Sequence, residues 1–140
     1  MKSKKLCGVI LIGILLVLQS VAAFAEPAVS EWIYKNEQQG SGFSMTLWRE
    51  GNKVWGQHTG WARNGSRIDD SRDKISIEGA SEDKPNEYIV CWQSGYSNAQ
   101  GWAYLIFSDD GTLLWQVFRV QVEGERYIPN KAVLQLVTDG

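Results

Sequence analysis

The sequence predicts an all-β fold, a small antiparallel β-barrel or strongly curved meander of about seven to eight strands. Three observations predict it: short stretches alternate apolar and polar residues, turn-forming residues separate these stretches, and no stretch after the N-terminal segment has convincing amphipathic helical spacing. Closing the sheet would remove the exposed edges that an antiparallel sheet must otherwise protect. The apolar run 132–137 fits a last strand or a short helix, and its spacing favours the strand.

The first 25 residues have the composition of a secretory signal peptide. Residues 2–5 include three lysines, residues 6–18 are almost wholly apolar, and Ala23-Phe24-Ala25 provides a small-residue cleavage site. The apolar run is shorter than the roughly 20 residues of a membrane-spanning helix. We expect cleavage before Glu26, a single domain over residues 26–140, a periplasmic or secreted location, and no membrane insertion after cleavage.

The charge and the metal-ligating residues of the predicted domain exclude several functions. Residues 26–140 carry 11 basic and 16 acidic side chains, a formal charge of −5, because three of the 14 basic residues precede the cleavage site. An acidic chain without a basic block does not suit nucleic acid or an anionic membrane. One histidine, His58, and one cysteine, Cys91, cannot supply the three or four ligands of a zinc site. We expect neither a metal nor a cofactor.

A two-residue turn defines the first predicted hairpin. Residues 43–50 alternate apolar and polar, Gly51-Asn52 follows, and residues 53–58 resume the extended pattern. Glycine at the first central position suits a type II′ turn. The register counted from this turn places Trp48 opposite Trp55, on a face that also carries hydroxyl and amide groups. We expect this face to be a solvent-exposed aromatic surface.

The rest of the chain supplies further strands and one more hairpin. We expect a polar loop over residues 62–73, strands over 74–78 and 87–93, and a second hairpin, residues 102–108 and 112–121, around Asp109-Asp110-Gly111. The two hairpins share the pattern acid–Gly–polar–x–aliphatic–Trp, which ends at Trp55 in the first and at Trp115 in the second. Two hairpins of similar design would produce this echo, and so would an internal duplication.

Three fragments carry a resemblance to a known family. Gly40-Ser41-x-Phe43, the stretch from Gly51 to His58, and Val90-x-Trp92-x-x-x-Tyr96-x-Asn98-Ala99 resemble the strands of avidin-type barrels. The resemblance implies a secreted, closed antiparallel barrel of eight strands with Ser41 and Trp92 at cavity positions. His58 stands where the family has Tyr, and the small hydroxyl residues expected after Asn98-Ala99 are replaced. We therefore take the architecture from the resemblance and do not expect biotin binding.

The sequence offers little support for catalysis. A Ser-His-Asp site would need His58, and no Gly-x-Ser-x-Gly turn occurs. We interpret His58 as a strand residue that faces Met45 at the sheet surface, and Cys91 as a small hydrophobe in an apolar strand. Basic neighbours of the acidic residues within 69–73 favour local ion pairs over a glycosidase pair or a calcium loop. We predict that the protein is not an enzyme.

The aromatic residues are the main functional signal. All seven tryptophans fall within residues 26–140, which is more than so small a core needs. We expect roughly half of them to pack inside and the others to contact a partner. The candidate aromatic binding face consists of Trp48, Trp55, Trp61, Trp92, Tyr96 and Trp102. The candidate charged binding loop consists of Asp69, Asp70, Arg72 and Asp73.

These observations predict an exported, non-enzymatic binding protein. The first hypothesis is an inhibitor or immunity protein that binds another envelope protein, such as a peptidoglycan hydrolase. A cationic hydrolase would be steered toward an acidic partner. The alternative is a small-molecule or glycan-binding barrel with a Trp-lined cavity.

Overall fold

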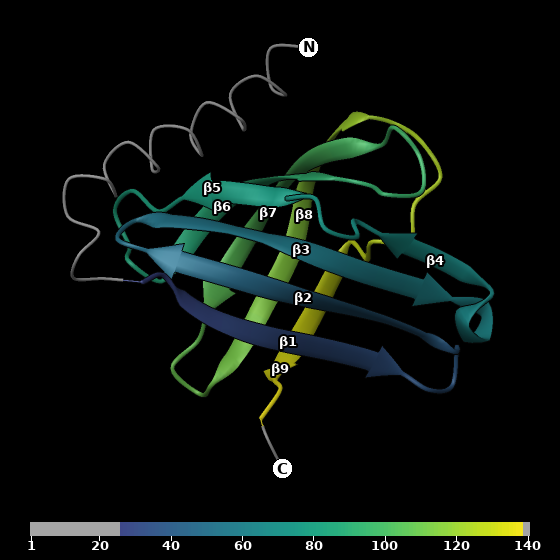
Figure 1. The fold of residues 1–140 in the computed structure, drawn as a ribbon, viewed down its shortest axis with the longest axis horizontal. Helices are drawn as coiled ribbons and strands as arrows, with labels where there is room; N and C mark the ends of the chain where they lie inside the picture. The colour runs from purple at the N-terminus through teal and green to yellow at the C-terminus, as the bar shows by residue number, and fades with distance from the viewer. Residues whose placement is uncertain (1–25, 139–140) are drawn as a thin grey trace.

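The computed structural model describes residues 26–138, and the predicted signal peptide lies outside them. The predicted all-β class is confirmed, since the described residues form strands joined by turns and one short 3₁₀ helix (Figure 1). The elements are β1 (Ala28–Asn36), β2 (Ser41–Glu50), β3 (Lys53–Ala62), η1 (Arg63–Gly65), β4 (Arg67–Asp70), β5 (Ile77–Ala80), β6 (Glu87–Gln93), β7 (Gln100–Phe107), β8 (Thr112–Val122) and β9 (Lys131–Leu136).

Eight strands close into an antiparallel barrel. The order around the barrel is β1-β2-β3-β5-β6-β7-β8-β9, and β9 pairs back onto β1. Strand β4 lies outside this circle and pairs with the second half of β3, whereas β5 pairs with the first half. Two strands therefore share one edge of β3 (Figure 1).

The predicted hairpins and the last strand are confirmed. Trp48 pairs with Trp55 and Met45 pairs with His58, as the count from a two-residue turn requires. Gly51 has φ +58°, the sign that a type II′ turn needs at its first central position. The second hairpin turns at residues 109–111 between β7 and β8, and residues 131–136 form a strand.

The structure differs from the expectation at two places. Residues 62–73, predicted to be a polar loop, contain η1 and β4, and the strand predicted over residues 74–78 spans Ile77–Ala80. Strand β4 could not be recognised by apolar alternation, because the one buried residue among its four, Asp69, is charged. Strand β1 was not predicted, because Trp32 and Tyr34 face inward while Val29 and Ile33 lie on the other face, which hides the alternation. None of the described residues form a helix that is long and apolar enough to cross a membrane.

Apolar side chains pack the barrel interior. Trp32, Trp92 and Trp115 are buried there. The Trp115 ring lies 5.3 Å from the ring of Phe43, and its Nε1–H donates to the carbonyl oxygen of Pro129 at 2.9 Å. Fully burying an apolar side chain of this size contributes about 1.5–3 kcal/mol or more. The buried cluster also includes Met45, Leu47, Val54, Ile77, Tyr88, Val90, Leu105, Leu113 and Leu134.

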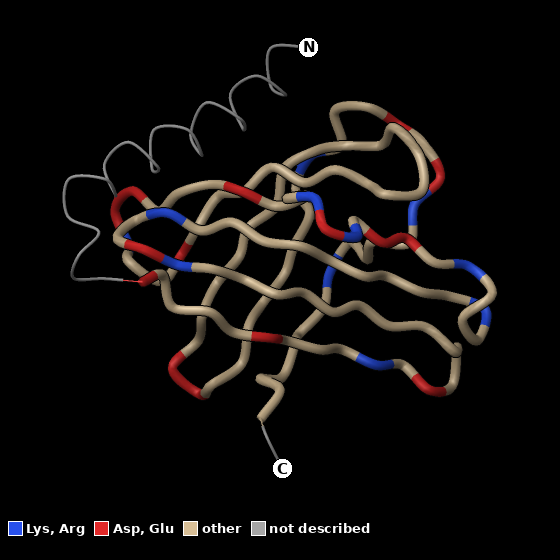
Figure 2. Tube along the Cα trace, in the orientation of Figure 1, with Lys and Arg blue, Asp and Glu red and all other residues tan. Residues whose placement is uncertain are grey.

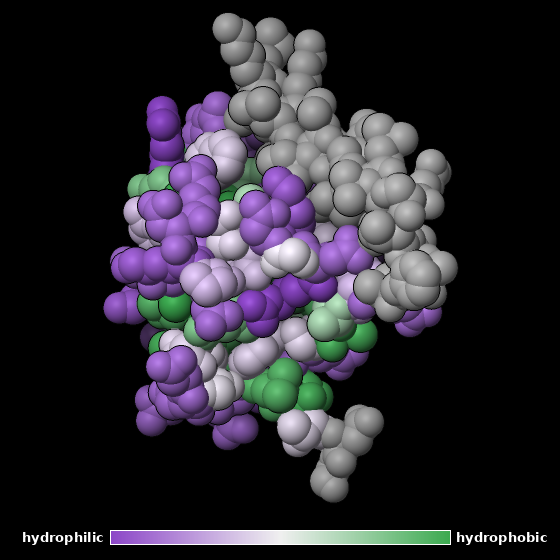
Figure 3. Space-filling view, turned by 90° about the vertical axis from the view of Figure 1, so that its left-hand side faces the viewer, coloured by the Kyte–Doolittle hydropathy of each residue, from purple (hydrophilic) through white to green (hydrophobic). Residues whose placement is uncertain are grey.

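One end of the barrel, where β2–β3, β5–β6 and β7–β8 turn, is closed by an aromatic cluster. The Phe107 ring contacts Trp32 and Tyr88 edge-on, each at 5.7 Å between centroids. The Arg49 guanidinium lies 3.8 Å above Phe107 and donates to the Tyr88 hydroxyl at 3.2 Å. Figure 3 looks onto this end, where hydrophilic side chains cover most of the surface and leave hydrophobic groups between them.

Candidate functional site

Three of the predicted binding tryptophans lie on the outer face of the barrel. Trp48 and Trp55 pair across β2 and β3. The row of cross-strand partners that includes this pair runs on through β5 and β6 and ends at Trp102 on β7. All three are half-buried. Trp61 also faces outward, and its ring lies over Gly42, where a side chain would collide with it. Four of the seven tryptophans therefore point away from the packed interior.

Trp92 is a correction to the predicted aromatic face. It has the inward orientation of Tyr88 and Val90 on β6 and is only 2% exposed. Its cross-strand partner is Gly101, where an added Cβ would lie 2.8 Å from the Trp92 ring. The glycine leaves room for the indole inside the barrel. Tyr96, in contrast, is exposed in the β6–β7 loop and contacts the Tyr127 ring at 5.1 Å.

An exposed aromatic pair on β7 and β8 was not predicted. Tyr104 and Phe118 stack with 4.4 Å between ring centroids and an interplanar angle of 29°. They are 40% and 45% exposed. Phe118 reaches Tyr104 because a register shift in β8 places it between the partners of Trp102 and Ala103. Alternation along β7 predicts that Tyr104 faces outward, but the predicted aromatic face was based on the tryptophan content and did not include it.

Aliphatic side chains surround this pair. Ile89 pairs with Tyr104 across β6 and β7, and Ile106 pairs with Leu114, which in turn pairs with Val133 on β9. Ile89 and Val133 are exposed. We call this surface the Tyr104 patch: Ile89, Tyr104, Ile106, Leu114, Phe118 and Val133.

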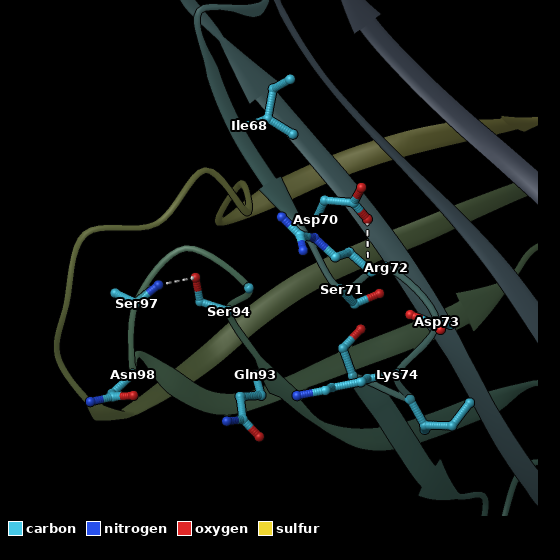
Figure 4. Close-up of a pocket in the computed structure, with 13 residues that line it drawn as sticks. Ile68, Asp70, Ser71, Arg72, Asp73, Lys74, Gln93, Ser94, Ser97 and Asn98 are labelled. Atoms are coloured by element: carbon cyan, nitrogen blue, oxygen red, sulfur yellow. Dashed lines mark hydrogen bonds between the residues drawn. The ribbon is translucent and has the colours of Figure 1, made fainter.

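Three of the four predicted loop charges line a groove at the barrel end opposite the β7–β8 turn. Asp70, Arg72 and Asp73 face a space of about 820 Å³ between the β4–β5 segment and the β6–β7 loop (Figure 4). The Asp70 carboxylate accepts a hydrogen bond from the Arg72 backbone N–H at 2.7 Å. We call this space the polar groove. Its lining comprises Ile68, residues 70–76, residues 93–95, Ser97 and Asn98.

Asp69 is a correction to the predicted charged loop, because its side chain is fully buried. Alternation along β4 turns it toward the barrel while its neighbours Ile68 and Asp70 face outward. Its carboxylate accepts hydrogen bonds from the Ser94 hydroxyl at 2.6 Å, the Gly95 N–H at 2.7 Å and the Tyr127 N–H at 3.1 Å. Burial alone would raise the pKa of Asp69, but the bonds from His58, Ser94 and the backbone lower it to about 2.

His58 is the fourth partner of Asp69 and is a second correction. The sequence placed it at the sheet surface, but it is buried inside the barrel wall. Its Nε2 lies 2.8 Å from Asp69 Oδ1, and its Nδ1 lies 2.7 Å from Ser76 Oγ. Met45 and His58 lie on the inner face of the hairpin together with Phe43 and Leu47, whose alternation marks that face as the apolar one. The contacts of His58 with Asp69 and Ser76 join separate segments, and the sequence could not show them.

Within the described part of the chain, no group of three or more His, Cys, Asp or Glu side chains could hold a metal ion. The geometry leaves two surfaces with possible function, the outward aromatic face with the Tyr104 patch and the polar groove. Comparison of the chain with protein-family models, with curated proteins and with solved structures found no match.

Proposed function

We propose that this chain is an exported binding protein that docks on a cationic envelope protein, such as a peptidoglycan hydrolase, through the Tyr104 patch. The observation that carries the proposal is the exposed stack of Tyr104 and Phe118 on the rigid outer wall of a packed barrel. Solvent-exposed aromatic side chains surrounded by aliphatic ones are typical of protein interfaces. The half-buried Trp102 lies two residues from Tyr104 on the same face of β7 and extends the surface.

Because side chains fill the barrel interior, the outer surface of the barrel is the place where a partner would bind. Three tryptophans and Phe43 occupy positions that a ligand would need along the barrel axis. The hypothesis of a small molecule in a Trp-lined cavity therefore gains no support from the geometry. A protein partner needs no cavity, because a curved sheet already offers a surface held rigid by its hydrogen bonds.

The charges beside the patch support a cationic partner. Glu87 pairs with Ile106 across β6 and β7, and the adjacent β7–β8 turn carries Asp109 and Asp110. Figure 2 shows acidic residues alone at the β7–β8 turn, and acidic and basic residues together at the β2–β3 and β5–β6 turns of the same barrel end. Acidic residues around an apolar centre would accelerate association with a positively charged protein, and added salt would slow it.

The experiment measures the affinity of the protein for a cationic lysozyme-type hydrolase, together with the activity of that enzyme. We expect binding at about micromolar affinity or tighter. The double variant Tyr104→Ser/Phe118→Ser should bind at least ~30-fold more weakly, because a single aromatic anchor commonly supplies about 2 kcal/mol.

The matched control is Val29→Ser/Ile68→Ser, which removes two apolar side chains that are 60% and 52% exposed on other strands. This control should keep the wild-type affinity. Equal losses in both double variants, or no binding to any envelope hydrolase tested, would contradict the proposal.

A further inference from the structure

Three hydrogen-bonded side chains beside the polar groove are not used by the proposed docking function. Ser76 lines the groove, His58 lies behind it and Asp69 lies behind His58. They come from three separate places: His58 from β3, Asp69 from β4 and Ser76 from the segment that precedes β5. Triads of this kind are recognised by geometry and roles, because their order along the chain differs between folds.

The neighbours of His58 indicate which tautomer its neutral ring adopts. Asp69 is ionised at neutral pH, since its pKa is lowered to about 2, and a carboxylate can only accept hydrogen bonds. In its neutral form, His58 presents Nε2–H to Asp69 and a lone pair on Nδ1. The Ser76 hydroxyl, 2.7 Å from Nδ1, donates to that lone pair in this form. Compared with the usual serine triad, the two ring nitrogens exchange roles.

We propose that Ser76 is a nucleophile for acyl transfer, with His58 as its general base and Asp69 as the residue that positions His58. The sequence offered little support for this chemistry because it has no Gly-x-Ser-x-Gly turn and because His58 was expected at the sheet surface. The structure places His58 between the buried Asp69 carboxylate and the hydroxyl of Ser76, a residue that lines the polar groove.

The reaction begins when Ser76 Oγ forms a bond to the carbonyl carbon of an ester and its proton moves to His58 Nδ1. The bond from that carbon to the alcohol oxygen then breaks, and the departing alcohol takes the proton from His58. Water attacks the acyl-serine in the same way, which releases the carboxylic acid and restores the Ser76 hydroxyl. No oxidant, metal or further reactant is needed.

The lining of the groove indicates the class of ester. The amides of Gln93 and Asn98, the hydroxyl of Ser97 and the carboxylate of Asp70 face the groove (Figure 4). Such groups hydrogen-bond hydroxyl-rich molecules. The substrate class is therefore a short-chain acyl ester of a polyhydroxylated alcohol, such as an acetylated sugar.

The test uses p-nitrophenyl acetate and an acetylated sugar on the full mature chain, with acetylated residues located by mass spectrometry. In the wild-type protein, Ser76 should be acetylated by p-nitrophenyl acetate at least ~100-fold faster than Ser97, which lines the same groove without a base, since general-base catalysis contributes about 10²–10⁴-fold. Acetate release from the sugar should require Ser76.

Two variants separate chemistry from structure. His58→Gln should abolish acetylation of Ser76, whereas Ser66→Ala, which removes a hydroxyl that donates to the Arg63 carbonyl oxygen outside the groove, should retain it. If His58→Gln fails to fold, the rate ratio of Ser76 to Ser97 in the wild-type protein decides the question. Acetylation of Ser76 no faster than that of Ser97 would overturn the proposal.

Discussion

Trp55 and Trp115 end the same short sequence pattern, yet one lies on the outer face of the barrel and the other in its core. Trp55 is half-buried and pairs with Trp48, whereas Trp115 is fully buried against Phe43. Both residues stand four positions after a turn glycine, Gly51 or Gly111, and both glycines have positive φ.

The difference comes from the place of the glycine in each turn. Gly51 opens a two-residue turn, so Trp55 is the third residue of β3. Gly111 closes the turn of residues 109–111, so Trp115 is the fourth residue of β8. Both strands begin with an outward residue, and side chains alternate along a strand. A shift of one position therefore exchanges surface and core.

The largest effect should come from shifting part of β8 by one residue, which exchanges its inner and outer side chains. Deleting Leu114, which lies inside β8, would either move Thr112 into the core position of Leu113 or exchange the faces of Trp115 and the residues after it, and we expect the variant to lose about 5 kcal/mol or more. Deleting Asp109 should be tolerated, because Asp110-Gly111 remains as a favoured two-residue turn and the register is kept. Circular dichroism and urea unfolding measure both. Equal stability of the two deletions would contradict this argument.

Truncating the two tryptophans compares the two faces directly. Trp115→Ala should lower the free energy of unfolding by about 3–5 kcal/mol, because it leaves a cavity in the core and removes the donor to Pro129. Trp55→Ala should cost about 1 kcal/mol or less. Urea unfolding curves give both values. If Trp55→Ala lowered the free energy of unfolding as much as Trp115→Ala does, the outer face would stabilise the fold as much as the core, which would contradict the account.

The next effect concerns the buried carboxylate of Asp69. Asp69→Asn turns an amide N–H₂ toward groups that already donate, so we expect a loss of about 2 kcal/mol at pH 7. The folded pKa of Asp69, about 2, lies below its ordinary value of 3.8, so its contribution is present above about pH 4 and is lost as the pH falls toward 2.

The stability of the wild-type protein should therefore fall more steeply than that of Asp69→Asn between pH 4 and pH 2. Urea midpoints across this range measure the difference. Parallel pH profiles would show that Asp69 titrates as an ordinary carboxyl group.

A smaller loss is expected at the opposite barrel end. Arg49→Leu removes the cation above Phe107 and the bond to the Tyr88 hydroxyl, which should cost about 1–2 kcal/mol. Arg49→Lys should be intermediate, because an ammonium cannot stack as a planar guanidinium does. Thermal unfolding compares the three proteins, and a leucine variant as stable as the wild type would show that packing alone closes this end.

The smallest effect on stability should come from the Tyr104 patch. Tyr104→Ser removes an outward side chain that is 40% exposed and stacks on Phe118, so the free energy of unfolding should fall by about 1 kcal/mol or less. The same substitution should weaken partner binding, which would separate the role of the patch in recognition from any role in folding. Urea unfolding and binding measurements on one preparation test both statements.

Local patterns predicted much of this fold. The two-residue turn at Gly51 sets the register of β2 and β3, so Trp48 and Trp55 could be placed correctly by counting. Alternation along residues 87–93 marks a strand whose bounds match β6. The same alternation places Trp92 on the face of Tyr88 and Val90. The sequence therefore contained the information that Trp92 points inward, although the predicted aromatic face included it.

The contacts of Asp69 beside the polar groove could not be predicted from the sequence, because they depend on pairing between distant segments. Asp69 is buried only because β4 folds back on β3 and the loops at Ser94 and Tyr127 supply donors. Nothing near Asp69 in the sequence distinguishes it from Asp70, which lines the groove. The stack of Tyr104 and Phe118 likewise requires the irregular register of β8.

Hydroxyl-radical footprinting of the protein with a bound cationic hydrolase tests most directly whether recognition takes place on the outer wall of the barrel. Tyr104 and Phe118, both exposed in the free protein, should become protected from oxidation, while Ile68 and Tyr96 at the groove end should remain reactive. Protection of Ile68 and Tyr96 with unchanged oxidation of Tyr104 and Phe118 would contradict the account.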